Sequence, residues 1–249
     1  MIRLKNEKEI AGIRASGQLL ASTLKELKKL VAEGITTREL DDAARAWIES
    51  HGGIPAFLGY MNYPATLCVS LNNEVIHGIP GPRKLRQGDI VSVDVGVDLN
   101  GYFSDAAITL PVGAVSRPRE KLMQVTRECL ERAIAQAMPG NRVSDISRAV
   151  YEHAVRNDFG VVREYCGHGT GFAMHEDPQV PNYVGSGPNP RLKEGMVLAI
   201  EPMINGGTGD IELLDDGWTV VTADGADSAH FEHTVAVLRD RMEILTLFH

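Results

Sequence analysis

The sequence lacks the features of a disulfide-stabilised secreted protein and of a nucleic-acid-binding protein. It has only three cysteines, Cys68, Cys129 and Cys166, and their odd number and wide spacing predict neither a disulfide framework nor a zinc knuckle. Lys and Arg number 25 against 33 Asp and Glu, so the formal net charge is −8 and the cation excess that favours phosphate binding is missing. We therefore expect a protein of the reducing cytoplasm that does not itself bind nucleic acid.

Long apolar runs are lacking as well. No run approaches the roughly 20 residues that a membrane-spanning helix requires. The first ten residues, MIRLKNEKEI, do not place a basic stretch before an apolar core as a signal peptide does. We therefore expect a cytoplasmic location and no membrane partner. Because 43% of the 249 residues are hydrophobic and no low-complexity linker divides them, we expect one domain over 1–249.

Two similar helix pairs are predicted along the chain. Apolar residues at helical spacing predict helices over 7–32 and 36–50. A comparable pair is predicted over 117–138 and 144–157, with Ser144 as the cap of its second helix. Aligning the pairs gives a few matching residues, which duplication and chance explain equally well. The repeated order of helix, helix and strands is the better indication of two similar halves on a shared sheet.

Strand signals follow each helix pair. A β-hairpin is predicted over 90–97 and 102–110, because Asn100-Gly101 between these segments is the strongest short hairpin signal. Further strands are predicted over 196–200, 218–222 and 231–238, and a surface loop rich in Pro, Gly and Asn is predicted over 178–190.

The hairpin places two carboxylates on one face of the sheet. A two-residue turn at Asn100-Gly101 pairs Asp94 with residue 107, so Asp105 lies diagonally across from Asp94 on the same face, roughly 7–8 Å away at the backbone. Two carboxylates at that distance repel each other unless a positive charge lies between them. For this hairpin alone, a solvated sheet face explains the pair as well as a bound cation does.

Two more carboxylates occur at apolar strands. Glu201 follows the apolar run 196–200, and Glu232 lies at the start of the strand predicted over 231–238. Buried carboxylates must be ion-paired, protonated or metal-bound. No Lys or Arg lies within the hairpin strands or beside Glu201 to form an ion pair.

His168 adds a nitrogen donor. It lies among the glycines of Cys-Gly-His-Gly-Thr-Gly, and as an isolated feature such a histidine is more often structural. Together with four carboxylates it indicates an oxygen-dominated metal site. That site suits two divalent first-row cations, such as Co, Mn, Fe(II) or Zn, better than a single structural zinc. A pair of such cations can deprotonate a bridging water for hydrolysis.

The order Asp94, Asp105, His168, Glu201, Glu232 resembles the metal-ligand set of the pita-bread metallohydrolases. The surrounding segments are similar as well: VSVDVGVDLNGYFSDAAIT, GHGTG, AIEPMI and HFEHTVAV, together with HGIP at 77–80 and GYMNYPATLCVS from residue 59. Within that group the chain resembles the type I methionine aminopeptidases over essentially its whole length. The resemblance implies an α+β pita-bread fold, with two pseudo-symmetric halves whose helices back a central antiparallel β-sheet.

The resemblance also implies an activity and a set of metal ligands. Members of this family are metal-dependent aminopeptidases that remove the initiator methionine from nascent proteins and prefer small second residues. A metal-bridging water or hydroxide attacks the first peptide bond. By this resemblance, Asp94 would be bidentate on one cation, and Asp105 and Glu232 would bridge both cations. His168 and Glu201 would complete the coordination of the other cation.

Further roles are carried over in the same way. Glu201 would be the general base, while His175 and His77 would contact the substrate amide and stabilise the tetrahedral oxyanion. The residues that match the apolar methionine pocket of the family are Phe57, Tyr60, Tyr63, Cys68, Met174 and Trp218. Met174 stands where a Phe often precedes the histidine, and Phe57 stands where some members have Cys. Both departures keep the pocket apolar but leave its fit to methionine less certain.

Two other functions are compatible with the same residues. Prolidases and creatinases share the metal ligands but usually carry an additional N-terminal domain, for which the segment before Asp94 is too short. Pita-bread proteins that only bind peptides or partners usually lack the ligands.

The expected partners are nascent polypeptide N-termini that begin with Met, close to the ribosome, and the expected state is a monomer.

Overall fold

The structure is a computed structural model that describes residues 1–247. Its helices are α1 (Glu7–Leu30), α2 (Thr37–Ser50), η1 (Tyr60–Asn62), α3 (Arg117–Ala135) and α4 (Val143–Arg156). Its strands are β1 (Ile54–Pro55), β2 (Leu67–Leu71), β3 (Glu74–Ile76), β4 (Ile90–Leu99), β5 (Tyr102–Pro111), β6 (Gly160–Val161), β7 (Gly167–Gly169), β8 (Glu176–Val180), β9 (Val197–Ile200), β10 (Met203–Asn205), β11 (Ile211–Leu213), β12 (Val220–Thr222), β13 (Ser228–His230), β14 (His233–Val237) and β15 (Met242–Ile244).

The helices begin and end within a few residues of the predicted positions. Helix α1 starts with a capping box, in which the Asn6 side chain accepts from the Glu9 N–H and the Glu9 carboxylate accepts from the Asn6 N–H. Thr36 and Glu39 form the same motif at α2. Helix α4 starts at Val143 rather than after Ser144, so the prediction that Ser144 caps this helix is wrong.

The β4–β5 hairpin has the predicted register. Asn100 and Gly101 both have positive φ, at 57° and 81°, as a tight two-residue turn requires. Asp94 therefore pairs with Ala107, and Asp105 pairs with Gly96. This register puts Asp94 and Asp105 on the same face of the sheet, while the intervening valines point to the other face.

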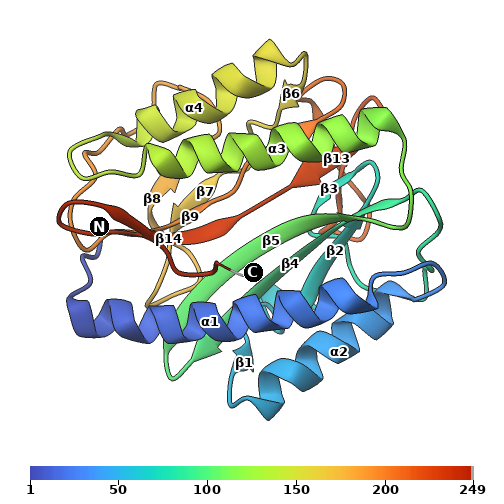
Figure 1. The fold of residues 1–249 in the computed structure, drawn as a ribbon, viewed down its shortest axis with the longest axis horizontal. Helices are drawn as coiled ribbons and strands as arrows, with labels where there is room; N and C mark the ends of the chain where they lie inside the picture. The colour runs from blue at the N-terminus through green and yellow to red at the C-terminus, as the bar shows by residue number, and fades with distance from the viewer. Residues whose placement is uncertain (248–249) are drawn as a thin grey trace.

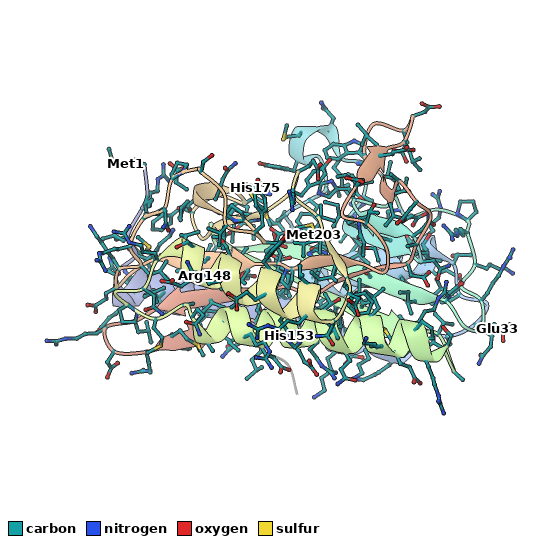
Figure 2. All side chains as sticks on the ribbon, turned by 90° about the horizontal axis from the view of Figure 1, so that it is seen from above. Met1, Glu33, Arg148, His153, His175 and Met203 are labelled. Carbon is teal, nitrogen blue, oxygen red and sulfur yellow. The ribbon has the colours of Figure 1, made fainter. Side chains whose placement is uncertain are left out.

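The valine face of the hairpin meets the helices. Leu20 and Leu24 of α1 share one apolar core with Val91 and Val93 of β4, and residues of α2, α3 and α4 belong to the same core. Each fully buried side chain of this size contributes about 1.5–3 kcal/mol to folding. Figure 1 shows α1 and α2 flanking the hairpin and α3 and α4 flanking the strands of the second half. In Figure 2, His175 lies on the opposite side of the sheet from His153 of α4.

The two halves join where β5 meets β14. The Glu232 N–H donates to the Ala107 carbonyl at 2.9 Å. Two residues further on, the Thr234 hydroxyl contacts both the N–H and the carbonyl of Asp105. These hydrogen bonds link the sheet of β4 and β5 to the β15-β14-β9-β7-β8 sheet of the second half, and every pairing between the named strands is antiparallel.

Two strand predictions and one loop prediction need correction. The strand predicted over 231–238 begins only at His233. Before this point β13 pairs with β10, and after it β14 pairs with β9. The chain changes its partner strand at Phe231 and Glu232, which therefore belong to neither strand. The strand predicted from Trp218 begins at Val220. Part of the loop predicted over 178–190 is strand β8. Strand β2 was not predicted, because its buried run has no alternation to reveal it.

Among residues 1–247, no helix combines the length and the apolar character needed to cross a membrane.

Candidate metal centre and peptide pocket

Five elements of both halves converge on one cavity of about 770 Å³. Asp94 and Asp105 reach it from β4 and β5, and His168 reaches it from β7. Glu201 follows β9, and Glu232 lies at the change of partner between β13 and β14. The five residues predicted as metal ligands are therefore brought together, although up to 138 positions separate them in the sequence (232 − 94 = 138).

The side chains in this group are buried and close together. Asp105, His168 and Glu232 are 4%, 7% and 2% exposed, and each offers one donor atom within 4.8 Å of the others. His168 Nε2 lies 3.7 Å from Asp105 Oδ2 and 3.5 Å from Glu201 Oε1. These distances allow three donor atoms to contact one ion.

The hydrogen bond of His168 selects the tautomer that a metal ligand needs. Its Nδ1 lies 2.9 Å from the carbonyl oxygen of Gly169, which can only accept, so Nδ1 carries the proton. Nε2 is then left with a lone pair directed at Asp105 and Glu201. Burial lowers the pKa of His168 to about 3, which keeps the imidazole neutral at neutral pH.

Burial makes the four carboxylates difficult to ionise. It raises the pKa of Asp94 to about 7 and that of Glu201 to about 8. The pKa values of Asp105 and Glu232 are raised well above their usual range, first by burial and then by repulsion from the neighbouring carboxylates. The group therefore needs either protons or cations to be stable.

Several oxygens of the group have no partner in the protein. Asp94 Oδ1, Asp105 Oδ1 and Glu232 Oε1 are buried and accept no hydrogen bond from residues 1–247. No Lys or Arg in this range forms an ion pair with any of the four carboxylates. Unpartnered carboxylate oxygens beside a neutral imidazole match the donor set of divalent first-row cations. The residues present thus fit a metal centre.

Two further histidines, His77 and His175, line the same cavity. His175 Nδ1 is 2.9 Å from the Tyr60 hydroxyl, and its ring centroid is 4.2 Å from that of His168. His77 contacts the edges of Tyr165 and Trp218, at centroid separations of 5.4 and 6.1 Å. Burial lowers the pKa of His77 to about 4, so its imidazole is neutral at neutral pH.

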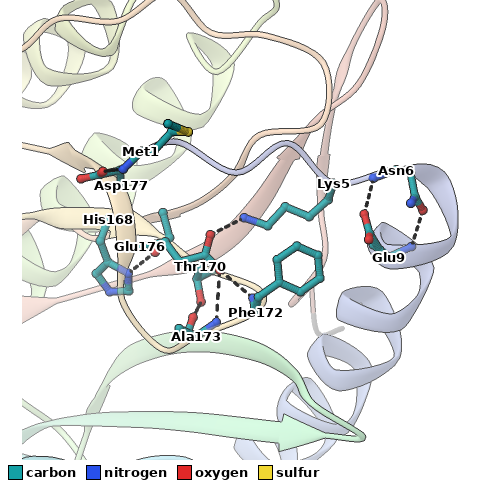
Figure 3. A network of polar contacts seen from close by, with 11 residues as sticks. Met1, Lys5, Asn6, Glu9, His168, Thr170, Phe172, Ala173, Glu176 and Asp177 are labelled. Atoms are coloured by element: carbon teal, nitrogen blue, oxygen red, sulfur yellow. Dashed lines mark hydrogen bonds and ion pairs between the residues drawn. The ribbon is translucent and has the colours of Figure 1, made fainter.

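Glu176 shapes the turn that carries His175. One of its carboxylate oxygens, Oε1, accepts from the N–H groups of Phe172 and Ala173 at 2.7 and 3.1 Å. Figure 3 shows this carboxylate inside the turn, with the Thr170 hydroxyl donating to Ala173. Backbone N–H groups that bond a buried carboxylate hold a turn in one conformation. The position of His175 is fixed in this way.

An apolar pocket adjoins the metal centre. Tyr63, Cys68 and Ala65 form a small cluster against which Phe57 and Trp218 pack, and the Tyr63 and Trp218 rings meet edge to face at 4.9 Å. The residues predicted for the methionine pocket that line the cavity are Phe57, Tyr60, Tyr63, Cys68 and Trp218. Met174 is buried but is not among the lining residues, and its methyl group lies next to Gly96.

The cavity also contains residues that sequence patterns did not reveal. Tyr165, Glu164 and Ile76 line it, and His230 lies buried with its Nε2 3.6 Å from Glu201 Oε2. His230 is two positions before Glu232, so the strand period would have placed both on one face. The strand period of two residues also places Thr234 on that face. The pattern alone therefore does not indicate that His230 in particular belongs to the site.

Comparison with known proteins identifies the family. Residues 11–239 match the profile of metallopeptidase family M24. The chain belongs to this family. A methionine aminopeptidase of Clostridium perfringens is 53% identical over 247 residues, which cover 99% of each chain. The crystal structure of a methionine aminopeptidase from Rickettsia prowazekii superposes with a TM-score of 0.97 at 42% identity, covering 99% of this chain and 100% of that one.

The comparisons also distinguish among M24 proteins. A prolidase from Pyrococcus horikoshii shares the fold, with a TM-score of 0.80, but is only 20% identical, and the match covers 64% of its length. The methionine aminopeptidases match this chain from end to end at twice that identity. The predicted α+β pita-bread fold and the predicted methionine aminopeptidase family are therefore confirmed.

Proposed function

We propose that this M24 protein is a metal-dependent aminopeptidase that removes the N-terminal methionine from polypeptides. The end-to-end similarity to methionine aminopeptidases supports this function. The observation that carries it is that four carboxylates, none of them paired with a Lys or Arg among residues 1–247, and one neutral imidazole line a cavity that also has an apolar wall. Such a cavity can hold an apolar first residue beside a hydrolytic centre.

The metal centre is proposed to hold two divalent cations. The residues that would hold them are Asp94, Asp105, His168, Glu201 and Glu232. The unpartnered oxygens of Asp94, Asp105 and Glu232 support this assignment. The donor set is compatible with Co, Mn, Fe(II) and Zn. Bound cations supply Lewis acidity and lower the pKa of water.

The protein's own residues then have three tasks. Glu201 accepts a proton from the attacking water and passes it towards the leaving amide nitrogen. His77 and His175 stand beside the carbonyl of the first residue, where their ring nitrogens can stabilise the developing oxyanion as hydrogen-bond donors. The Tyr60 hydroxyl, at 2.9 Å from His175 Nδ1, orients the second of these rings.

The apolar wall is proposed to select methionine. Phe57, Tyr63, Cys68 and Trp218 form a partly buried cluster beside the metal centre. Tyr60 also lines the cavity, and Met174 lies next to Gly96, as Phe57 does. A flexible thioether side chain fits such an irregular apolar site. We expect small second residues to be preferred.

We further propose that residues 1–249 act as one catalytic domain, because both halves contribute side chains to the same cavity. The expected substrates are nascent chains that begin with Met, met in the cytoplasm close to the ribosome by a monomeric enzyme. Three free thiols and a net charge of −8 are consistent with a reducing compartment and with no nucleic-acid binding by the enzyme itself.

A peptide comparison tests the function. The metal-loaded protein should release Met from Met-Ala-Ser and should leave Ala-Pro intact. A matched peptide, Met-Ile-Ser, should be cleaved far more slowly because of its bulky second residue. Cleavage of Ala-Pro with no cleavage of Met-Ala-Ser would show a prolidase instead. Binding of peptides without cleavage of any would show a binding protein.

A further inference from the structure

His230 is a buried histidine of the cavity region that the proposed mechanism does not use. It ends strand β13 and is 2% exposed. Its backbone is held by Thr109 of β5, whose hydroxyl accepts from the His230 N–H at 2.9 Å and contacts the His230 carbonyl at 2.7 Å. Pairing with Met203 of β10 holds the other side of the strand. The ring therefore projects from a backbone that is fixed on both sides.

The ring nitrogen of His230 faces Glu201. Its Nε2 is buried, has no hydrogen-bond partner among residues 1–247, and lies 3.6 Å from Glu201 Oε2. The other oxygen, Glu201 Oε1, lies 3.5 Å from His168 Nε2. The carboxylate of Glu201 is thus placed between two imidazoles, with one oxygen directed at each.

The two imidazoles cannot play the same role. The hydrogen bond from His168 Nδ1 to Gly169 leaves His168 Nε2 with a lone pair, so it cannot donate to Glu201. His230 Nε2 is free to carry a proton, and a buried donor is stabilised by a nearby acceptor. A separation of 3.6 Å is slightly longer than a hydrogen bond, and catalytic contacts of this kind shorten when the reacting complex forms.

We propose that His230 is a positioning residue for the reaction, which rests on the proposed function of Glu201 as general base. Its Nε2–H donates to Glu201 Oε2 and fixes the carboxylate in the orientation that directs Oε1 towards His168. Groups that orient a ligand or base in this way typically change activity by about 10–100-fold when removed. His230 acts through Glu201 and does not touch the substrate.

Three substitutions of similar size test the proposal. His230→Gln keeps an N–H close to the position of Nε2. The side chain of His230→Asn is one bond shorter, so its N–H does not reach that position, and His230→Leu has no N–H at all. With Met-Ala-Ser as substrate, we expect Gln to retain kcat within about 3-fold. Asn and Leu should lower kcat at saturating metal by about 10-fold or more while KM stays unchanged. Equal kcat values for Gln and Leu, or a loss confined to KM or metal content, would overturn the proposal.

A structural measurement supplies a readout that does not depend on activity. In crystals of the Gln variant, Glu201 should keep its orientation, with Oε1 near His168 Nε2. In the Asn and Leu variants Glu201 should adopt another rotamer. An unchanged Glu201 in all three variants would overturn the proposal even if the unmodified protein cleaved no methionine peptide. If Leu does not fold, Gln and Asn alone provide the comparison.

Discussion

Lys5 and Glu176 form an ion pair although their side chains are only 1% and 6% exposed. Lys5 Nζ lies 2.7 Å from Glu176 Oε2, across a sequence separation of 171 residues. Because Glu176 Oε1 bonds the turn before His175, the segment preceding α1 is tied to the loop that carries a proposed catalytic histidine. Figure 3 shows Lys5 reaching this carboxylate beside the Phe172 ring.

Removing one partner of this ion pair should destabilise the protein strongly. Lys5→Met leaves the Glu176 carboxylate buried without its cation, which typically costs about 3–5 kcal/mol. The free energy of unfolding in urea measures the loss. The double variant Lys5→Met/Glu176→Gln should recover part of it, because no charge is then left unpaired.

An exposed ion pair serves as the control. Arg45 and Glu49 on α2 are both about half exposed, and Arg45→Met should change the free energy of unfolding by less than about 1 kcal/mol. If Lys5→Met costs no more than this control, the buried pair does not stabilise the loop.

Asp105 should be required for turnover but not for folding. Asp105→Ala removes a proposed bridging ligand and should lower kcat/KM by a factor on the order of 1,000 or more. The metal-free variant should remain folded, because removing one of four crowded carboxylates relieves repulsion. Circular dichroism and peptide cleavage measure the two effects. The exposed Asp215→Ala is the matched control, and full activity of Asp105→Ala would refute the metal assignment.

Metal binding should release protons. Burial raises the pKa of Asp94 to about 7 and that of Glu201 to about 8, so both carboxyls are largely protonated in the metal-free protein below these values. In the metal-free protein, the raised pKa values of Asp94 and Glu201 make the folded state hold its protons more tightly than the unfolded state does. Their contribution to the free energy of unfolding is therefore fully present below the unfolded pKa of about 4, and it is lost as the pH rises towards 8. Cations displace the protons, and metal affinity should therefore rise with pH.

Calorimetric titration at pH 6.5 in buffers of different ionisation enthalpy measures the number of protons released. We expect about one or more per protein, and fewer for Glu201→Gln. Binding enthalpies that do not depend on the buffer would contradict the raised carboxyl pKa values.

Cys68 should behave as a pocket wall and not as a nucleophile. Burial raises the pKa of its thiol well above the usual range, so the reactive thiolate is scarce at neutral pH. Cys68→Ala should keep kcat within a few-fold and alter mainly KM for methionine peptides. Steady-state kinetics tests this, and a loss of kcat comparable with that of Asp105→Ala would point to a direct chemical role.

The parts of the fold that the sequence predicted are those that local chemistry decides. The Asn100-Gly101 turn determines the β4–β5 register, and the register places Asp94 and Asp105 on one face. The first two helices were predicted from apolar spacing, and they begin close to the predicted positions, at the caps Asn6 and Thr36. The metal-ligand set stays a prediction, which rests on the distinctive short segment around each proposed ligand.

The parts that were not predicted depend on contacts between distant segments. His230 faces Glu201 because β13 pairs with β10 and because Thr109 of β5 holds its backbone. The ion pair between Lys5 and Glu176 joins segments far apart in the chain. No local spacing encodes either contact, since each joins segments that are distant in the sequence.

Methionine removal should depend on cations held by His168 and the four carboxylates beside it. The most direct measurement is metal content and Met-Ala-Ser cleavage in one sample, stripped with a chelator and then restored with Mn, Co, Fe(II) or Zn. We predict no cleavage in the stripped protein, and recovery that rises in proportion to the metal bound. Cleavage that persists at full rate without metal would show that methionine removal does not depend on cations held by these residues.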